Sequence, residues 1–342
     1  MDWMGSVKDK AGLIVKEMML MKNIFLGHPI LCVWQVTARC DFTCRICHFW
    51  KEPHSIKDEL TTSQIRILIE KMAPIAPLMM TLAGGEPLLR ADIHEIVKIV
   101  SQKHFCSMIT NGWYMTRSLA RKLYDHGLAD AMVSIDYATP GKHDLQRGRT
   151  GAFEHALKAI EYLRDTRPDK AHKVRILAVL MDDNIDELEG LLLLAQELGV
   201  SFALTLYSNN LGKKPNYFPD PPVSDYLIAL KKKHPHFDSV RDYLSAYDRA
   251  LKTKGIKNCG GGKTFINMDE KGDITRCIDQ KGQTAGNPLR DPIAQICKTL
   301  LTQRQNKPCS NCWTSCRGLA EMITGPFGIR TYPELRKTRK SI

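Results

Sequence analysis

Long hydrophobic runs and a secretory leader are both missing from this sequence. No stretch approaches the roughly 18 uninterrupted apolar residues of a membrane span. The start of the chain, Met1 to Lys10, is not a basic leader followed by an apolar run and a small-residue cleavage site. Internal repeats and low-complexity tracts are missing as well. We therefore expect a globular, cytoplasmic protein.

Acidic residues are fewer than basic ones. The 342 residues include 49 Lys and Arg against 37 Asp and Glu, which gives a net charge of +12, and 43% of all residues are hydrophobic. This mixture is typical of a globular enzyme, and the length predicts two domains or one large barrel with an extension. The positive charge favours an acidic substrate, a membrane surface or nucleic acid as a partner, and charge alone does not choose among them.

The eleven cysteines are odd in number and gather in two groups. In a chain without an export signal, this pattern argues against a disulfide framework. Cys32 and Cys106 lie inside apolar segments, and we interpret both as small core residues. The first group is Cys40, Cys44 and Cys47, and the second is Cys259, Cys277, Cys297, Cys309, Cys312 and Cys316.

Six short apolar runs alternate with helix-like segments through the first two thirds of the chain. We expect strands at Leu31–Val36, Leu78–Leu82, Phe105–Ile109, Ala131–Ile135, Val174–Leu180 and Ser201–Leu206. We expect helices at Thr62–Met72, Ile93–Lys103, Thr116–His126, Ala152–Asp165, Ile185–Leu198 and Val223–His234. This rhythm predicts parallel βα units, and six of them make an α/β fold in the form of a partial (β/α)6 barrel.

The sequence divides into three expected parts. Residues 1–30 hold an amphipathic helix over Lys10–Phe25, residues 31–237 form the barrel, and residues 238–342 form a small C-terminal cysteine-rich domain. The helix could pack as a lid on the barrel. Alternatively, it could make a peripheral membrane contact, with Met and Leu inserted and lysines near anionic lipid.

Cys40, Cys44 and Cys47 directly follow the first predicted strand. Barrel enzymes place their chemistry at the carboxyl ends of strands, and soft thiolates select zinc, copper(I) or iron–sulfur clusters. Three cysteines without a fourth would leave one iron of a four-iron cluster open for chemistry. His48 as a fourth ligand would instead close a zinc site.

The tetrapeptide Gly84-Gly85-Glu86-Pro87 follows the second predicted strand. Its glycines let the backbone come close to a ligand, and its proline fixes the turn. Together with the Cys-x3-Cys-x2-Cys loop, this motif resembles the radical S-adenosylmethionine (SAM) enzyme superfamily. The resemblance implies a partial barrel of the radical SAM type. It also implies a [4Fe-4S] cluster bound to the three cysteines and to SAM, whose amino group the backbone carbonyls of the glycine motif would hold.

Further polar residues end the third and fourth predicted strands. The resemblance places Asn111 where the family's barrels face SAM. It implies that Ser134 and Arg147 meet the SAM carboxylate, which suits the planar fork of arginine, and that Asp136 meets the ribose. Each of these residues could instead be a polar loop residue or a cap. Asn184, just beyond the fifth strand, could be a helix cap or an adenosine contact.

A hairpin with a cysteine at each foot is expected over 259–277, and more cysteines follow it. Four such thiolates could hold zinc as well as iron. The arrangement resembles SPASM and twitch domains, which implies one auxiliary [4Fe-4S] cluster. Cys297, in an apolar segment, is expected to be a buried structural thiol. The implied ligands are Cys259, Cys277, Cys309 and Cys312, with Cys316 as a competitor for either late position.

The resemblance also implies a reaction. SAM would be cleaved reductively to a 5′-deoxyadenosyl radical that abstracts hydrogen from a substrate carbon, and the auxiliary cluster would assist oxidation or bond formation. An electron donor such as flavodoxin or ferredoxin is implied. About 30 residues before the first strand are too few for a leader-binding domain, which favours biosynthesis of a small metabolite, and the net charge favours an anionic one.

Three alternatives remain open at this point. The substrate could be a ribosomal peptide or a protein side chain. A non-catalytic iron–sulfur or zinc protein would bind metal without cleaving SAM. Nucleic acid is not expected, because a basic cluster such as Arg336–Lys340 is more commonly a solvated tail.

Overall fold

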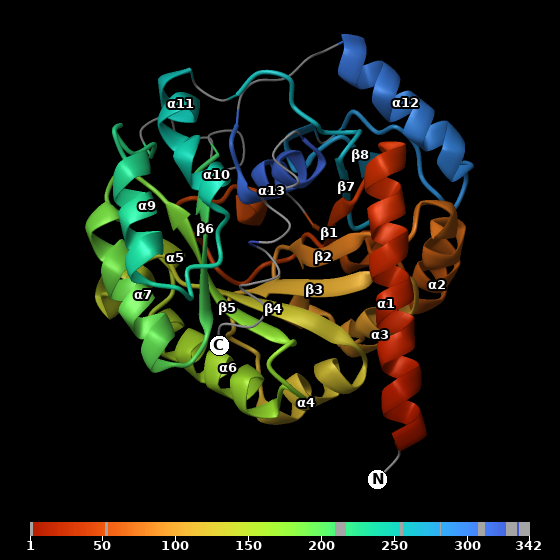
Figure 1. Cartoon of the computed structure of the whole chain (residues 1–342). Helices are drawn as coiled ribbons and strands as arrows, with labels where there is room; N and C mark the ends of the chain where they lie inside the picture. The colour runs from red at the N-terminus through yellow and green to blue at the C-terminus, as the bar shows by residue number, and fades with distance from the viewer. Residues whose placement is uncertain are drawn as a thin grey trace.

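One curved sheet of eight strands organises the chain (Figure 1). The computed structural model describes residues 3–51, 54–208, 217–253, 256–280, 282–306, 312–325 and 334, so Cys309 lies outside the described residues. The strand order is β6-β5-β4-β3-β2-β1-β7-β8, and every neighbouring pair is parallel except β7 with β8. The strands are β1 (Leu31–Thr37), β2 (Met79–Gly84), β3 (Phe105–Thr110), β4 (Leu128–Ser134), β5 (Lys173–Leu180), β6 (Ser201–Leu206), β7 (Phe265–Met268) and β8 (Ile274–Thr275).

Helices cover the outer face of the sheet (Figure 1). Along the barrel these are α2 (Thr62–Lys71), α3 (Ile93–Lys103), α4 (Arg117–Asp125), α5 (Pro140–Arg147), α6 (Ala152–Thr166), α7 (Leu188–Glu197) and α9 (Ser224–Lys233). The others are α1 (Trp3–Leu26), α10 (Arg241–Ser245), α11 (Tyr247–Lys252), α12 (Ile293–Asn306) and α13 (Ser315–Thr324). Short 3-10 turns are η1 (Phe49–Lys51), η2 (Ile56–Asp58), η3 (Ala73–Ile75), η4 (Pro87–Leu89), η5 (Ile185–Glu187) and η6 (Ile278–Gln280).

Local sequence explains these elements. The strands are apolar runs because both faces of a parallel sheet are covered. α2 begins at a capping box, in which the Thr61 hydroxyl accepts from the Gln64 amide and the Gln64 side chain accepts from the Thr61 amide. All six predicted strands and all six predicted helices are confirmed to within a few residues, and Cys32 and Cys106 lie in the main core as expected.

The predicted C-terminal hairpin is present, but its pairing was not foreseen. β7 lies parallel to β1, with Leu31 opposite Phe265, and the hairpin therefore extends the barrel sheet by two strands. The indole of Trp34 on β1 also donates to the Asp269 carbonyl in the hairpin turn, at 3.1 Å. The cysteine-rich region is thus built directly onto the strand that leads into the first cysteine loop.

The N-terminal helix α1 packs at the amino ends of β2 and β3. The Asn23 amide donates to the carbonyls of Ile75 and Pro77, just before β2, at 3.1 and 3.2 Å. The Lys16 ammonium donates to the carbonyls of Ser101 and His104, just before β3. α1 is therefore held against this end of the barrel. Within the described residues, no helix has the length and apolar character that crossing a membrane requires.

Candidate active site

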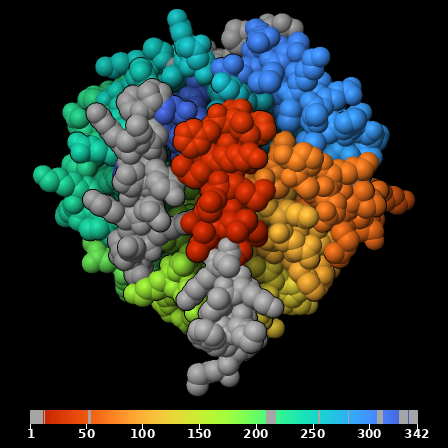
Figure 2. Space-filling model, turned by 45° about the vertical axis from the view of Figure 1, so that its right-hand side comes forward, coloured from red at the N-terminus to blue at the C-terminus, as the bar shows by residue number. Residues whose placement is uncertain are grey.

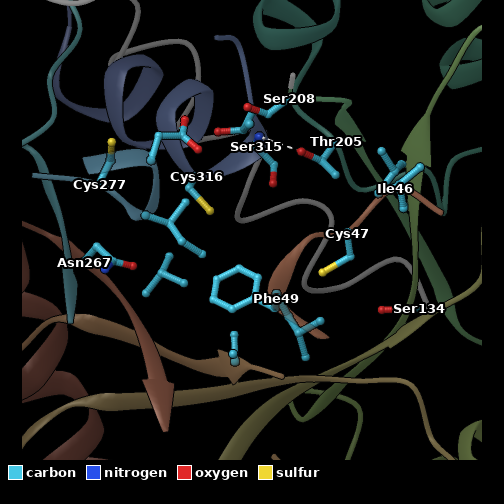
Figure 3. Close-up of a pocket in the computed structure, with 18 of the residues that line it drawn as sticks. Ile46, Cys47, Phe49, Ser134, Thr205, Ser208, Asn267, Cys277, Ser315 and Cys316 are labelled. Atoms are coloured by element: carbon cyan, nitrogen blue, oxygen red, sulfur yellow. Dashed lines mark hydrogen bonds between the residues drawn. The ribbon is translucent and has the colours of Figure 1, made fainter. Parts of the chain in front are cut away.

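A cavity of about 340 Å3 opens at the carboxyl ends of the barrel strands and is bounded by the hairpin and by α13. Both groups of cysteines reach its wall. Figure 3 shows Cys47 and Ile46 on one side and Cys316 and Cys277 on the other, with Phe49 between them. The cysteines in the lining are Cys40, Cys44 and Cys47 from the first group and Cys259, Cys277, Cys312 and Cys316 from the second.

The glycine motif brings β2 against the start of the cysteine loop. The Gly85 amide donates to the Thr37 carbonyl and the Glu86 amide donates to the Arg39 carbonyl, both at 2.8 Å. A Cβ at Gly84 would overlap the Thr37 carbonyl oxygen, and a Cβ at Gly85 would overlap that of Arg39. Local packing therefore requires both glycines, while Gly84, Gly85 and Glu86 also line the cavity.

Glu86 joins the carboxyl ends of β2 and β3. Its carboxylate is almost fully buried and accepts from the Leu88 amide, the Thr110 hydroxyl and the Asn111 amide, at 2.9, 2.7 and 2.7 Å. Burial raises the pKa of Glu86 to about 7, and the three donors oppose that shift. Pro87 is buried and begins the turn η4, as its place in the motif predicts.

Two thiols of the first cysteine loop, Cys40 and Cys44, have raised pKa values, which favours their protonated form. Burial raises the pKa of Cys40 to about 12, and it raises the pKa of Cys44 to about 11 although the charge of Arg147 lowers it. Metal binding must displace these protons, which couples metal affinity to pH. Arg147 supplies positive charge beside Cys44, and its guanidinium is ion-paired with Asp136 at 2.8 Å.

The other residues predicted to contact SAM do not all line the cavity. Asn111, Ser134 and Arg147 line the cavity, and the side-chain amide nitrogen of Asn111 (Nδ2) is buried without a hydrogen-bond partner. Asp136 is fully buried outside the lining, where it accepts from the Val179 amide and pairs with Arg147, so its contact with ribose stays a prediction.

Asn184 stands at the N-cap position of η5, as one of its two alternatives expected, but its side chain has a different role. Its side chain makes no capping hydrogen bond to η5. Its amide nitrogen donates to the carbonyls of Asp136 and Val179, at 3.0 and 2.8 Å, and its oxygen accepts from the Met181 amide at 2.8 Å. Fully buried, Asn184 ties the end of β5 to the segment after β4.

An aromatic brace that the sequence did not reveal supports the first cysteine loop. The Arg149 guanidinium lies 3.6 Å from the centroid of the Trp113 ring and pairs with Asp41 of the loop. The Trp113 ring stacks on His155, with centroids 3.8 Å apart. The Trp113 amide also donates to the Asn111 side chain, so the brace links the loop to the end of β3. An arginine two residues after Arg147 carried no signal of this role.

The second cysteine group is drawn together by α13. Cys259, Cys277 and Cys316 pack on one small apolar cluster with Leu31 and Phe265. Cys316 is therefore the late cysteine that shares a cluster with Cys259 and Cys277. Burial raises the pKa of Cys316 to about 11, and Cys312 contributes to that shift. Cys309 lies outside the described residues.

Arg317, a buried arginine whose role the sequence did not reveal, joins these segments. Arg317 donates to the carbonyls of Cys312, Ile256 and Lys257, and its Nε bonds Glu321 at 2.8 Å. Its side chain is fully buried. The segment before Cys259 and the segment that holds Cys312 are thereby fixed to one helix.

The donor set fits iron–sulfur clusters. Both groups consist of thiols in a largely apolar wall, and such ligands select iron–sulfur clusters or zinc. In the described part of the chain, no three Cys, His, Asp or Glu side chains converge as ligands of a single metal ion, and His48 does not line the cavity. Cys297 is half-buried against the main core and lies outside the cavity lining.

Comparisons with known proteins agree with this geometry. A family model for the Radical SAM superfamily matches residues 34–195. The mycofactocin maturase MftC of Mycolicibacterium smegmatis is 27% identical over 88% of this chain and 81% of its own length. An AdoMet-dependent heme synthase of Methanosarcina barkeri is 34% identical over 50% of this chain, and this match spans 48% of that enzyme.

Two solved structures share the fold. SuiB of Streptococcus suis bound to its precursor peptide SuiA has a TM-score of 0.61 and 17% identity, covering 79% of this chain and 64% of that one. The anSMEcpe structure with AdoMet and the Cp18Cys peptide has a TM-score of 0.61 and 14% identity, covering 92% of this chain and all of that one. At these identities the likeness extends to the fold alone.

Proposed function

Because this chain belongs to the radical SAM superfamily, we propose that the cavity between its two cysteine groups is the active site of a radical SAM enzyme with an auxiliary cluster. The observation that carries this proposal is that thiols of both groups line one cavity. A substrate between the two groups would have a radical source on one side and an electron acceptor on the other.

The first cysteine group and the residues around it would have different roles. A [4Fe-4S] cluster and SAM, when bound, would supply one-electron cleavage of the SAM carbon–sulfur bond. Cys40, Cys44 and Cys47 would ligate the cluster. Arg147 and the buried, unpartnered side-chain amide nitrogen of Asn111 would bind polar groups of SAM.

The wall between the sites is mainly apolar, with Phe49, Leu206 and Ile278 among its residues. Such a wall keeps water and stray hydrogen donors away from a reactive substrate. At the far side, we assign the auxiliary ligands to Cys259, Cys277, Cys312 and Cys316, with Cys309 as the competing late ligand. A cytoplasmic location and a flavodoxin or ferredoxin as electron donor remain predictions.

We favour a peptide as the substrate over a small metabolite. The maturase match covers 88% of this chain, whereas the heme synthase match covers 50% of it. Both similar structures named above contain a peptide. The sequence alone favoured a metabolite, and these similarities are the reason that we favour a peptide instead.

Anaerobic reconstitution tests the chemistry. Reconstituted protein should hold about eight irons per chain and should form 5′-deoxyadenosine from SAM and dithionite. About four irons with cleavage would remove the auxiliary cluster from the proposal. Bound zinc without cleavage would refute it.

A second experiment separates the substrate classes. The low-molecular-weight fraction of a lysate of the source organism is added to the reconstituted enzyme, and formation of 5′-deoxyadenosine is followed. Stimulation that disappears after digestion of the fraction with proteinase K supports a peptide. Stimulation that survives digestion supports a metabolite and contradicts our preference.

A further inference from the structure

The outer face of α1 is an apolar stripe that the barrel leaves uncovered. Its exposed large hydrophobic side chains recur at helical spacing along almost four turns. Phe25 is 85% exposed and Met18 is 68% exposed, values that are unusual for such residues in a folded chain. The members of the stripe are Ile14, Val15, Met18, Met19, Phe25 and Leu26.

The inner face of the same helix is anchored. Asn23 is buried and donates to two backbone carbonyls before β2, and Lys16 donates to two before β3. The helix therefore has a fixed orientation, and the stripe points away from the barrel because the opposite side is bonded to it. Figure 2 shows this helix lying on the surface of the molecule, beside the segments coloured orange and yellow.

Among the side chains of α1 that the structure describes, those charged on the exposed face are basic. Lys22 is exposed within the stripe, and Lys263 is exposed beside the helix end, where its side chain lies against Gly27. Glu17, the acidic residue of the helix whose side chain is described, is half-buried and off the stripe. A partner that meets this face must accept apolar side chains together with positive charge. An anionic lipid surface offers both, since acyl chains lie beneath acidic headgroups.

The position of the stripe suits a peripheral contact. α1 lies at the amino ends of β2 and β3, whereas the cavity lies at the carboxyl ends of the strands. Docking through α1 would leave the cavity and its mouth facing away from the lipid. We propose that the outer face of α1 binds the protein to an anionic membrane surface.

Vesicle flotation of the full-length protein tests this inference. The protein should float with vesicles of phosphatidylcholine and phosphatidylglycerol, and should do so less with phosphatidylcholine alone or at high salt. Met18→Ser combined with Phe25→Ser should lower vesicle binding about tenfold or more, because two inserted apolar side chains are lost. Lys22→Glu should weaken binding to the vesicles that contain phosphatidylglycerol and should leave binding to pure phosphatidylcholine vesicles unchanged.

Ile67→Ser is the matched control, because Ile67 is an exposed apolar residue on α2 (52% exposed) that lies outside the stripe. It should leave flotation unchanged. Failure of the wild type to float, or equal flotation of the double variant, would overturn the proposal. A wild-type dimer in light scattering that the double variant converts to a monomer, without vesicle binding, would assign the stripe to a second copy of the chain instead.

Discussion

The two cysteine groups reach one cavity by different routes. The first group lies on one loop between β1 and η1, and strand-end contacts from Thr37 and Arg39 hold that loop in the barrel. The second group is assembled from three segments that come together only when the hairpin pairs with β1 and α13 packs beside it. One site is therefore local to the barrel, and the other depends on long-range assembly.

This difference has a consequence for stability. The loop of the first group is held by several independent contacts, including the Glu86 network, the ion pair of Arg147 and the brace of Arg149. The second group relies on Arg317 to join two of its segments. We therefore expect the C-terminal site to be lost more easily than the first one.

Removal of a cysteine from the first group should have the largest effect on catalysis. Cys47→Ala should reduce 5′-deoxyadenosine formation to background, because the reactive cluster loses a ligand, while iron at the C-terminal site remains. Iron should fall by about four per chain. Cys297→Ala is the matched control, since that half-buried thiol lies outside the cavity. Cleavage of SAM by Cys47→Ala would sink the assignment of the first site.

Removal of a cysteine from the second group should separate iron content from SAM cleavage. Cys277→Ala should also lose about four irons per chain, yet it should still cleave SAM without a substrate, because the first loop is held independently. Unchanged iron content would argue against a cluster at this site. Cys316→Ala and Cys309→Ala, measured in the same way, identify the late ligand.

Arg317→Met should destabilise the second cysteine group, whose segments are joined by long-range contacts. The substitution leaves three backbone carbonyls without their donor and should lower the free energy of unfolding by on the order of 3 kcal/mol. Urea unfolding measures this loss, and iron analysis should show selective loss of C-terminal iron. Arg164→Met, at a partly exposed arginine, is the control. Loss of iron from both sites equally would contradict the comparison.

The contrast between local and long-range contacts also explains which features the sequence predicts. The six barrel strands and the first cysteine loop follow from local patterns, namely apolar runs and cysteine spacing. The parallel pairing of β7 with β1 joins residues more than two hundred positions apart, and no local pattern encodes such a partner. α5 was missed because Pro140–Arg147 is mostly polar and begins with Pro and Gly. In the sequence, Arg317 and Arg149 cannot be told from surface arginines, because only tertiary contacts bury Arg317 and stack Arg149 on Trp113.

The smallest predicted effect concerns the brace of the first loop. Arg149→Lys keeps the positive charge near Asp41 but loses the flat stack on Trp113, and a cation–π contact contributes about 0.5–1 kcal/mol. We expect a KM for SAM about two- to fivefold higher and a small shift in the electron paramagnetic resonance spectrum of the reduced first cluster. Arg117→Lys is the matched control, because Arg117 lies 5.5 Å from the Tyr162 ring and pairs with Asp165 away from the cavity. Equal effects of the two substitutions would show that Arg149 does not position the loop, and the first site would then owe its robustness to Glu86 and Arg147.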